Sequence, residues 1–366
     1  MSGIDPTRPF CAVSLRAAAE NLFFGCGGLQ GGDRVLILHE TPGQGYYDDA
    51  LAGRLATVAR DLGLSASLVE VGFDREAESL PKPVIESMRA VDLTVFLARV
   101  GDQLRFQAFP EGTRAVVSYA LDTASFASSF GTAPYAGFLA LKGVVEEALA
   151  SAEEITIRCQ AGTDVRGSGS ACAPASDVEI LRFPMLMPCP VLAAGFSGRV
   201  ALSGFLAGTG SRYYDPFAVE FEGPVSALFK DGRLTGFDGA PADVALANDH
   251  YDHVANRFAI DRDFVHSWHA GIHPACVFPG RASDCYMRWS GSAFGNPRLL
   301  HFHTCGAYAP GEICWNVVDP TITLDGVAVW ESGRLHPERV PGGASILADH
   351  PDIAALFRNP SRQIGI

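Results

Sequence analysis

The sequence predicts a two-domain α/β protein, with an N-terminal βαβ domain built on a parallel sheet and a β-rich α+β C-terminal domain. Three observations predict this class. In the first third of the chain, short apolar runs alternate with segments that have apolar residues at helical spacing. From about residue 153, short alternating segments are separated by Gly and Pro turns. The chain has 366 residues, 48% of them hydrophobic, which is enough for two separate cores.

The first domain is expected to contain strands separated by helices, and helices of this length connect parallel strands. The turn at residues 41–49 holds two glycines, but it lacks the spacing of a dinucleotide-binding fingerprint. Residues 1–150 are therefore interpreted as a Rossmann-like α/β domain. The strands expected there are at 31–40, 65–73, 93–99 and 113–121. The expected helices are at 51–64 and 136–152, and a further helix starts at Val84 and leads into the third strand.

Residues 151–366 are expected to form a β-rich domain, because short alternating strands continue to the end of the chain. The Asp-Gly pairs at 231–232 and 325–326 and the Ser-Gly pair at 332–333 predict tight hairpin turns, since glycine readily adopts the positive φ that such turns need. The domain boundary is placed near residue 150.

The charge and the cysteines exclude several classes of protein. A formal net charge of −13 disfavours nucleic acid or an anionic membrane as a partner. The N-terminus lacks the pattern of a signal peptide, and no apolar run approaches the ~20 residues that cross a bilayer. The nine cysteines are scattered without a CxxC pair, which is typical of reduced thiols. A cytoplasmic location is expected.

Histidines cluster in the second domain. Only His39 precedes residue 250, and seven histidines then occur within 54 positions: His250, His253, His266, His269, His273, His301 and His303. Neutral imidazole is a common metal ligand, so the stretches at 267–278 and 299–306 are candidates for a site. Period-two alternation puts His301 and His303 on one face of a strand, where they either bind a metal or line a polar cleft. Gly271 and Pro274 predict a loop around His273.

Other kinds of site have less support. No G-x-S-x-G nucleophile elbow is present. Cys305 is close to His303, but no residue that would orient a base is readable, so a metal-independent hydrolase is disfavoured. All four tryptophans, including Trp315, lie in the second domain, where they form core or line an apolar groove.

Four segments together resemble the thermophilic metallo-aminopeptidases and the related 2,5-dihydroxypyridine ring-opening dioxygenases. In those proteins a strand leads into a Gly-Thr-Asp turn, as at Gly162-Thr163-Asp164, and a Gly-Leu-Asn-Pro turn corresponds to Gly271-Ile272-His273-Pro274. The resemblance implies a ligand cleft between the two domains. The segments that carry it are EEITIRCQAGTDVRGSG, RFPMLMPCPVLAAGFSGRVAL, FEGPVSALFKDGRLTGFDG and HAGIHP.

The resemblance also implies a degenerate metal site. Met185, Leu186 and Met187 stand where the peptidases have metal-binding glutamates, and Ser267 stands at the next ligand position. The last His-x-Asp pair of the family corresponds to Val317-Val318-Asp319, so among the ligand positions that can be matched only Asp319 survives. A dinuclear hydrolytic centre needs several carboxylates to balance two dications, and such a set is missing at these positions.

Two functional hypotheses follow. The first is a non-catalytic protein without a metal or other cofactor that binds a peptide or small molecule and presents it to a partner enzyme, as an accessory protein of ribosomal-peptide natural-product biosynthesis would. The alternative is a mononuclear Fe(II) or Zn(II) enzyme, a ring-cleaving dioxygenase or an aminopeptidase, with His266 (or His269), His303 and Asp319 as ligands. The resemblance also implies a homodimer. The residues expected to line the ligand site are His266, His269, His301, His303, Trp315, Asn316 and Asp319.

Overall fold

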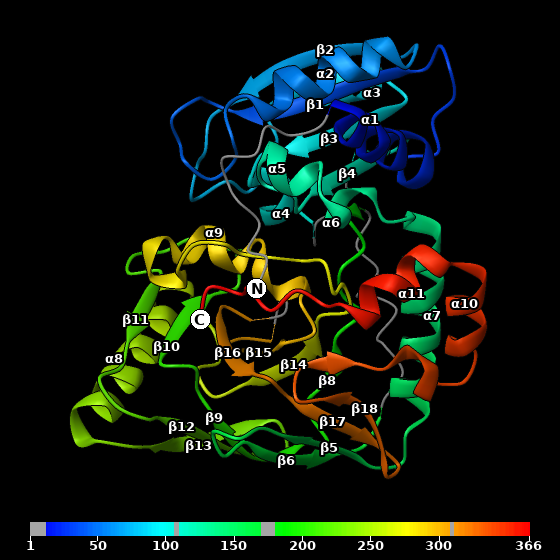
Figure 1. The fold of residues 1–366 in the computed structure, drawn as a ribbon. Helices are drawn as coiled ribbons and strands as arrows, with labels where there is room; N and C mark the ends of the chain where they lie inside the picture. The colour runs from blue at the N-terminus through cyan, green and yellow to red at the C-terminus, as the bar shows by residue number, and fades with distance from the viewer. Residues whose placement is uncertain (1–11, 106–109, 170–179, 308–310) are drawn as a thin grey trace. The chain divides into compact units, whose positions relative to one another are not determined.

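The computed structural model describes the chain except for residues 1–11, 106–109, 170–179 and 308–310 (Figure 1). The chain divides into two compact units, Met1–Phe138 with Val178–Met185, and Leu139–Asp177 with Leu186–Ile366. The predicted mixed α/β class is confirmed, since the first unit holds a parallel sheet and the second holds two antiparallel sheets. The boundary predicted near residue 150 lies at the end of helix α7 (Tyr135–Ser151), whereas this division assigns most of α7 to the second unit.

The first unit is built on a five-stranded sheet of order β2-β1-β3-β4-β7, in which every pair is parallel. The four predicted strands form close to their predicted positions, and β3 is buried along its whole length, as expected of a central parallel strand. The fifth strand, β7, comes from a stretch that the sequence assigned to the second domain. The elements are α1 (Ala12–Glu20), η1 (Asn21–Cys26), β1 (Arg34–Glu40), α2 (Leu51–Asp61), β2 (Ser65–Val71), α3 (Lys82–Arg89), β3 (Leu93–Leu97), α4 (Val100–Gln103), β4 (Ala115–Ser118), α5 (Thr123–Phe126), α6 (Ser129–Thr132) and β7 (Leu181–Phe183).

The second unit contains a six-stranded sheet, β11-β10-β16-β15-β14-β8, and an eight-stranded sheet, β13-β12-β9-β6-β5-β17-β18-β19. Its strands are β5 (Ile155–Arg158), β6 (Asp164–Gly167), β8 (Val191–Leu192), β9 (Ser197–Ala201), β10 (Phe205–Gly208), β11 (Ala218–Glu220), β12 (Ser226–Lys230), β13 (Arg233–Asp238), β14 (Val265–Ala270), β15 (Leu299–Thr304), β16 (Ile313–Val318), β17 (Thr321–Leu324), β18 (Val327–Glu331) and β19 (Arg334–Leu335). Its helices after α7 are α8 (Pro241–Phe258), η3 (Ala282–Asp284), α9 (Tyr286–Ser290), η4 (Ala293–Gly295), η5 (Pro337–Arg339), α10 (Gly343–Asp349) and α11 (Pro351–Arg358).

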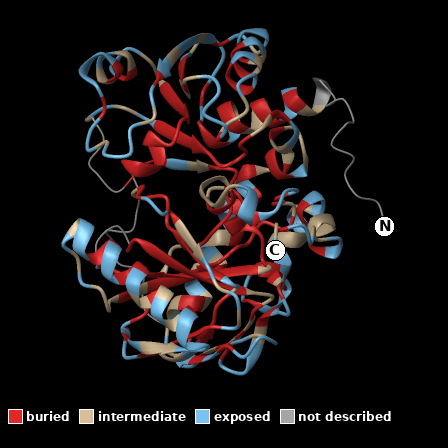
Figure 2. Ribbon diagram, turned by 90° about the vertical axis from the view of Figure 1, so that its left-hand side faces the viewer, coloured by how far each residue is buried: buried red, intermediate tan, exposed pale blue. Residues whose placement is uncertain are grey.

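Aromatic side chains form the core between the two sheets of the second unit. Trp268, Phe302 and Trp315 lie side by side on β14, β15 and β16, and all three are completely buried. Phe196, just before β9, and Phe229 of β12 contact them, with ring centroids 5.6–5.7 Å apart. Figure 2 shows the strands of this region largely as buried residues. One face of the β14–β16 ribbon is therefore devoted to the core.

The three predicted hairpin turns are confirmed. The pair Asp231-Gly232 joins β12 to β13 with φ values of 50° and 69°, and the turns at 325–326 and 332–333 have the same pattern of positive φ. The 18-residue helix α8 corrects the expectation of strands throughout this domain. Pro241 starts the helix, and Tyr251 and Val254 lie on its buried face.

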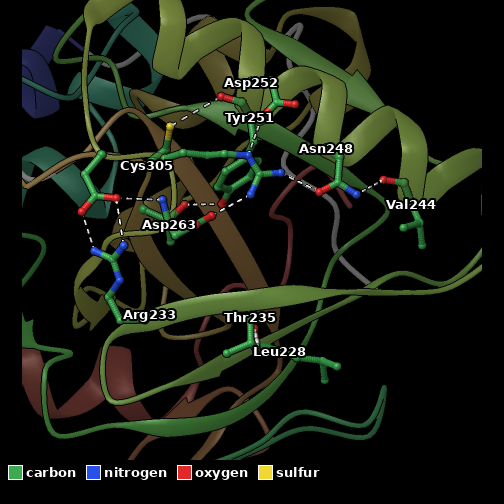
Figure 3. Close-up of polar contacts among 12 residues, drawn as sticks. Leu228, Arg233, Thr235, Val244, Asn248, Tyr251, Asp252, Asp263 and Cys305 are labelled. Carbon is green, nitrogen blue, oxygen red and sulfur yellow. Dashed lines mark hydrogen bonds and ion pairs between the residues drawn. The ribbon is translucent and has the colours of Figure 1, made fainter.

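A polar network ties α8 to the segment that enters β14. The Arg262 guanidinium donates to Asp252 and Asn248 of the helix and to Asp263, at 2.5–2.6 Å, and these three acceptors are labelled in Figure 3. The arginine also lies over the Tyr251 ring, 5.6 Å from its centroid. The start of β14 is thereby held against α8. None of the helices in the described part of the chain is long and apolar enough to span a membrane.

Candidate functional site

Three histidines gather on the face of the six-stranded sheet opposite to the aromatic core. The register places His269 of β14 directly beside His301 of β15, and His303 follows His301 on the same face. Their ring centroids are 4.4–4.9 Å apart, and one ligand nitrogen from each ring lies within 4.8 Å of the others. All three are at most 4% exposed. The prediction that His301 and His303 share a face is confirmed, and His269 joins them from a strand that the sequence did not predict.

The hydrogen bonds of His269 define its tautomer. Its Nδ1 is 3.0 Å from the carbonyl oxygen of Pro188, which only accepts, so Nδ1 carries the proton in the neutral ring. The lone pair of Nε2 then faces His301 Nε2 at 2.9 Å. Metal-ligating histidines characteristically donate their other ring N–H to a carbonyl or carboxylate in this way. His269 is thus oriented with its Nε2 toward the centre of the cluster.

A second chain of hydrogen bonds reaches His303 through Ser267. The Ser267 Oγ lies 3.1 Å from His303 Nδ1 and 2.8 Å from His266 Nδ1. The register of β14 shifts between Val265 and Ser267, and the extra residue at this bulge is His266. Burial lowers the pKa of His266. When His303 carries its proton on Nδ1, the Ser267 hydroxyl accepts a hydrogen bond from that N–H and donates its own hydrogen to His266 Nδ1. The lone pair of His303 is then on Nε2, the atom that would bind a metal.

Two more side chains complete the face. Phe294 stacks on His301, with ring centroids 4.0 Å apart and planes at 18°. Asn316 of β16 lies directly opposite His301 on the other side of β15 and is 0% exposed. Neither amide atom of Asn316 has a hydrogen-bond partner among the residues that the structure describes. A buried amide normally has partners, which makes Asn316 a candidate to contact a molecule bound at the histidines.

The structure separates the remaining predicted residues from the three histidines. Trp315 points into the aromatic core, because its neighbours His301 and Asn316 occupy the opposite face. Asp319 follows β16, and its carboxylate accepts two hydrogen bonds of 2.6 Å from Arg298. The predicted ligand set of His266, His303 and Asp319 does not come together. In the described residues, the potential ligand atoms that gather within 4.8 Å of one another belong to His269, His301 and His303.

The other candidate histidines and Cys305 also lie outside the group of His269, His301 and His303. His250 and His253 lie on α8, and His273 lies in the loop after β14, as Gly271 and Pro274 predict. Cys305 is completely buried, and burial raises the pKa of its thiol to about 12. A thiol with such a pKa is protonated at neutral pH, which argues against Cys305 as a nucleophile.

His250 predicts a loss of stability in acid. The ring is 3% exposed, and burial, followed by the nearby His253, lowers its pKa from 6.5 to about 4. Between these pH values His250 is therefore protonated in the unfolded chain and neutral in the folded chain. The free energy of unfolding is expected to keep this contribution above pH 6.5 and to lose it as the pH falls toward 4, at ~1.4 kcal/mol per pH unit and about 3 kcal/mol in total.

Urea denaturation between pH 7 and pH 4 measures this effect. His250→Leu is expected to flatten the dependence, while His253→Gln, an exposed position on the same helix, keeps most of it. An unchanged slope in His250→Leu would show that other groups cause the acid sensitivity.

The histidine cluster has the donors that a borderline divalent metal prefers. Imidazole suits Zn, Cu, Fe and Ni, whereas Mg and Ca prefer oxygen ligands, which the cluster lacks. The 2.9 Å between the Nε2 atoms of His269 and His301 is shorter than the ~3.3 Å between two nitrogens that bind one tetrahedral zinc at about 2.0–2.1 Å. A small separation of the two rings would make this distance fit, so the residues present are suited to a metal.

Comparisons with known proteins show the fold. No protein-family model matches the sequence, and no curated protein is significantly similar to it. Among solved structures, the 2,5-dihydroxypyridine dioxygenase from Pseudomonas putida KT2440 is similar with a TM-score of 0.58 and 16% identity, over 90% of this chain and 98% of that chain. Wild-type AmpT from Thermus thermophilus has a TM-score of 0.48 and 12% identity, over 88% and 99% of the two chains. The predicted resemblance to the dioxygenase is thus confirmed as a likeness of fold.

Proposed function

We propose that this protein is a metal-dependent enzyme whose mononuclear centre is held by His269, His301 and His303. The observation that carries the proposal is the meeting of three buried imidazoles from two adjacent strands, with ligand atoms within 4.8 Å of one another. Burying three polar rings on one face costs free energy unless hydrogen bonds or a metal ion satisfy their nitrogen atoms. The carbonyl of Pro188 and the hydroxyl of Ser267 orient two of the rings from outside, as the second shell of a metal site does.

Zn(II) is the metal that we favour, and Fe(II) is the alternative. Catalytic zinc sites combine three protein ligands with one open position, whereas non-haem iron oxygenases commonly use two histidines and one carboxylate. No carboxylate belongs to the group of ligand atoms found in the described residues. A dioxygenase activity, as in the structural neighbour, would require iron to bind to histidines alone.

The protein's own residues have defined tasks in this proposal. A bound zinc ion would supply a Lewis acid and an open position for a water or a substrate atom. His269 and His301 direct their Nε2 atoms to one point, and Ser267 with His266 holds the tautomer of His303. Phe294 covers one side of His301 and restricts access of water there. Asn316 offers an amide to whatever occupies the site.

The non-catalytic alternative remains a second candidate because one observation favours it. The Nε2 atoms of His269 and His301 are at hydrogen-bond distance, so the pair is satisfied without a metal. In that case the histidine face would bind a peptide or small molecule and present it to a partner enzyme. Asp319, which the sequence placed among the residues lining the ligand site, is less available to a ligand, since Arg298 contacts both of its oxygens.

Metal content distinguishes the two candidates. Protein purified without chelators and then incubated anaerobically with Zn(II) or Fe(II) is expected to retain one ion per chain after gel filtration, measured by plasma mass spectrometry. Failure to retain either ion would overturn the enzyme proposal and favour the metal-free ligand-binding protein. A homodimer, a partner enzyme and a role in natural-product biosynthesis stay predictions that sedimentation and binding assays can test.

A further inference from the structure

The surroundings of the histidine cluster point to the charge of its ligand. Three neutral imidazoles leave both positive charges of a divalent ion unbalanced by protein ligands. Because a buried charge is stable only when it is paired, this imbalance favours an anion in the open position. The inference rests on the proposed metal centre and concerns what binds to it.

The carboxylates that flank β16 already have other partners. Glu312, just before the strand, accepts from Ser211 Oγ at 3.3 Å and lies 3.6 Å from the Arg212 guanidinium. Asp319, just after the strand, is held by Arg298. Neither belongs to the group of ligand atoms at the histidines. The negative charge that balances a bound dication therefore has to arrive with the ligand.

Asn316 supplies the second observation. Its amide is 0% exposed, it lies on the same face as His301 and directly beside it, and both of its polar atoms lack a partner among the described residues. An amide NH₂ in this position donates to an oxygen held next to His301. An unused buried donor costs free energy, so a ligand that accepts from it gains more than a ligand that does not.

The chemistry of the site selects a carboxylate among anions. Phosphate is typically held by Arg, Lys or several backbone N–H groups, whereas the donor identified here is a single neutral amide, and the apolar Phe294 ring stacks on the neighbouring His301. A carboxylate has two oxygens, of which one can meet the metal position and the other the Asn316 amide. We propose that the exchangeable ligand or substrate of this centre is a small monocarboxylate, recognised by the metal position and by Asn316 Nδ2 together.

Cobalt(II) provides a readout that does not depend on activity, because its visible spectrum reports its ligands. The Co(II)-loaded protein is titrated with acetate and benzoate, with the neutral isosteres acetamide and benzamide, and with inorganic phosphate. We expect saturable spectral changes with the carboxylates and affinities at least about 10-fold weaker for the amides. Equal affinity for benzoate and benzamide, or tighter binding of phosphate, would overturn the inference.

Two near-isosteric variants test the role of Asn316. Asn316→Leu removes the donor, and we expect it to bind Co(II) about as well as the wild type while benzoate affinity falls about 10- to 100-fold. Asn316→Asp adds a negative charge beside the metal position, so Co(II) should bind more tightly and benzoate more weakly. Circular dichroism checks that each variant is folded. Because the two variants alter the site in different ways, one misfolded variant does not remove the test.

The outcomes separate the inference from the proposed function. If the wild type binds neither Co(II) nor Zn(II), both are overturned. If it binds Co(II) but benzoate affinity is unchanged in both variants, the metal centre stands and the role of Asn316 is refuted. Loss of Co(II) binding in Asn316→Leu would make Asn316 a metal ligand or a structural residue, which also refutes its assignment to the carboxylate.

Discussion

Replacing His301 with glutamine is expected to lower the affinity for Zn(II) by more than ~100-fold, because even the loss of a residue that only orients a ligand costs about 10- to 100-fold. The ring centroid of His301 is 4.4 Å from that of His269 and 4.7 Å from that of His303, so the loss of its imidazole leaves two of the three proposed ligands. Glutamine keeps a polar side chain of intermediate size in the buried site, which limits the effect on folding. Isothermal titration calorimetry with a competing chelator measures the affinity.

The matched control for this variant is His253→Gln. His253 is an exposed histidine on α8, and its Nε2 meets the carbonyl oxygen of Asp215 rather than the cluster. The His253→Gln variant should bind Zn(II) with the affinity of the wild type. Zinc affinity that is retained in His301→Gln, or lost equally in both variants, would contradict the assignment of the three ligands.

The second large effect is expected at Trp315. Its side chain is completely buried, contacts the rings of Phe229 and Phe302, and donates its Nε1–H to the Tyr251 hydroxyl at 2.6 Å. Trp315→Ala leaves a large cavity in the core between the sheets and is expected to reduce the free energy of unfolding by about 3–5 kcal/mol. Urea denaturation at neutral pH measures the change.

This result would distinguish the core position from the ligand-lining role expected from the sequence. A ligand-lining tryptophan would affect binding and leave stability nearly unchanged. Trp315→Phe keeps most of the ring volume and should lose distinctly less stability than Trp315→Ala. Leu139→Ala, at a position that is 47% exposed, is expected to stay within about 0.5 kcal/mol of the wild type. A similarly small change in Trp315→Ala would contradict the core assignment.

Local patterns were sufficient to predict much of the fold. Short apolar runs identified the parallel strands, since strands buried on both faces have near-continuous hydrophobic sequences. The hairpin turns were equally local, because the positive φ at Asp231 and Gly232 is a property of the two residues themselves. By contrast, β7 was assigned to the second domain, because its pairing with β4 joins segments more than 60 residues apart in the sequence.

The residues of the candidate site also differ in whether a local pattern predicts them. Alternation within β15 was enough to place His301 and His303 on one face. Phe294 gave no comparable signal, because its stacking on His301 depends on how the η4 turn packs over β15. The same holds for Pro188, whose carbonyl comes from a loop 81 residues before His269.

The sequence by itself determined the class of the fold, the hairpins and the concentration of histidines in the second domain, because each depends on neighbouring residues. Only the tertiary structure decided which residues meet. The register between β14, β15 and β16 set His269 and Asn316 on either side of His301, and it turned Trp315 to the opposite face. A shift of one residue in any of these strands would exchange its two faces, and no local pattern encodes the partner to which a strand is aligned.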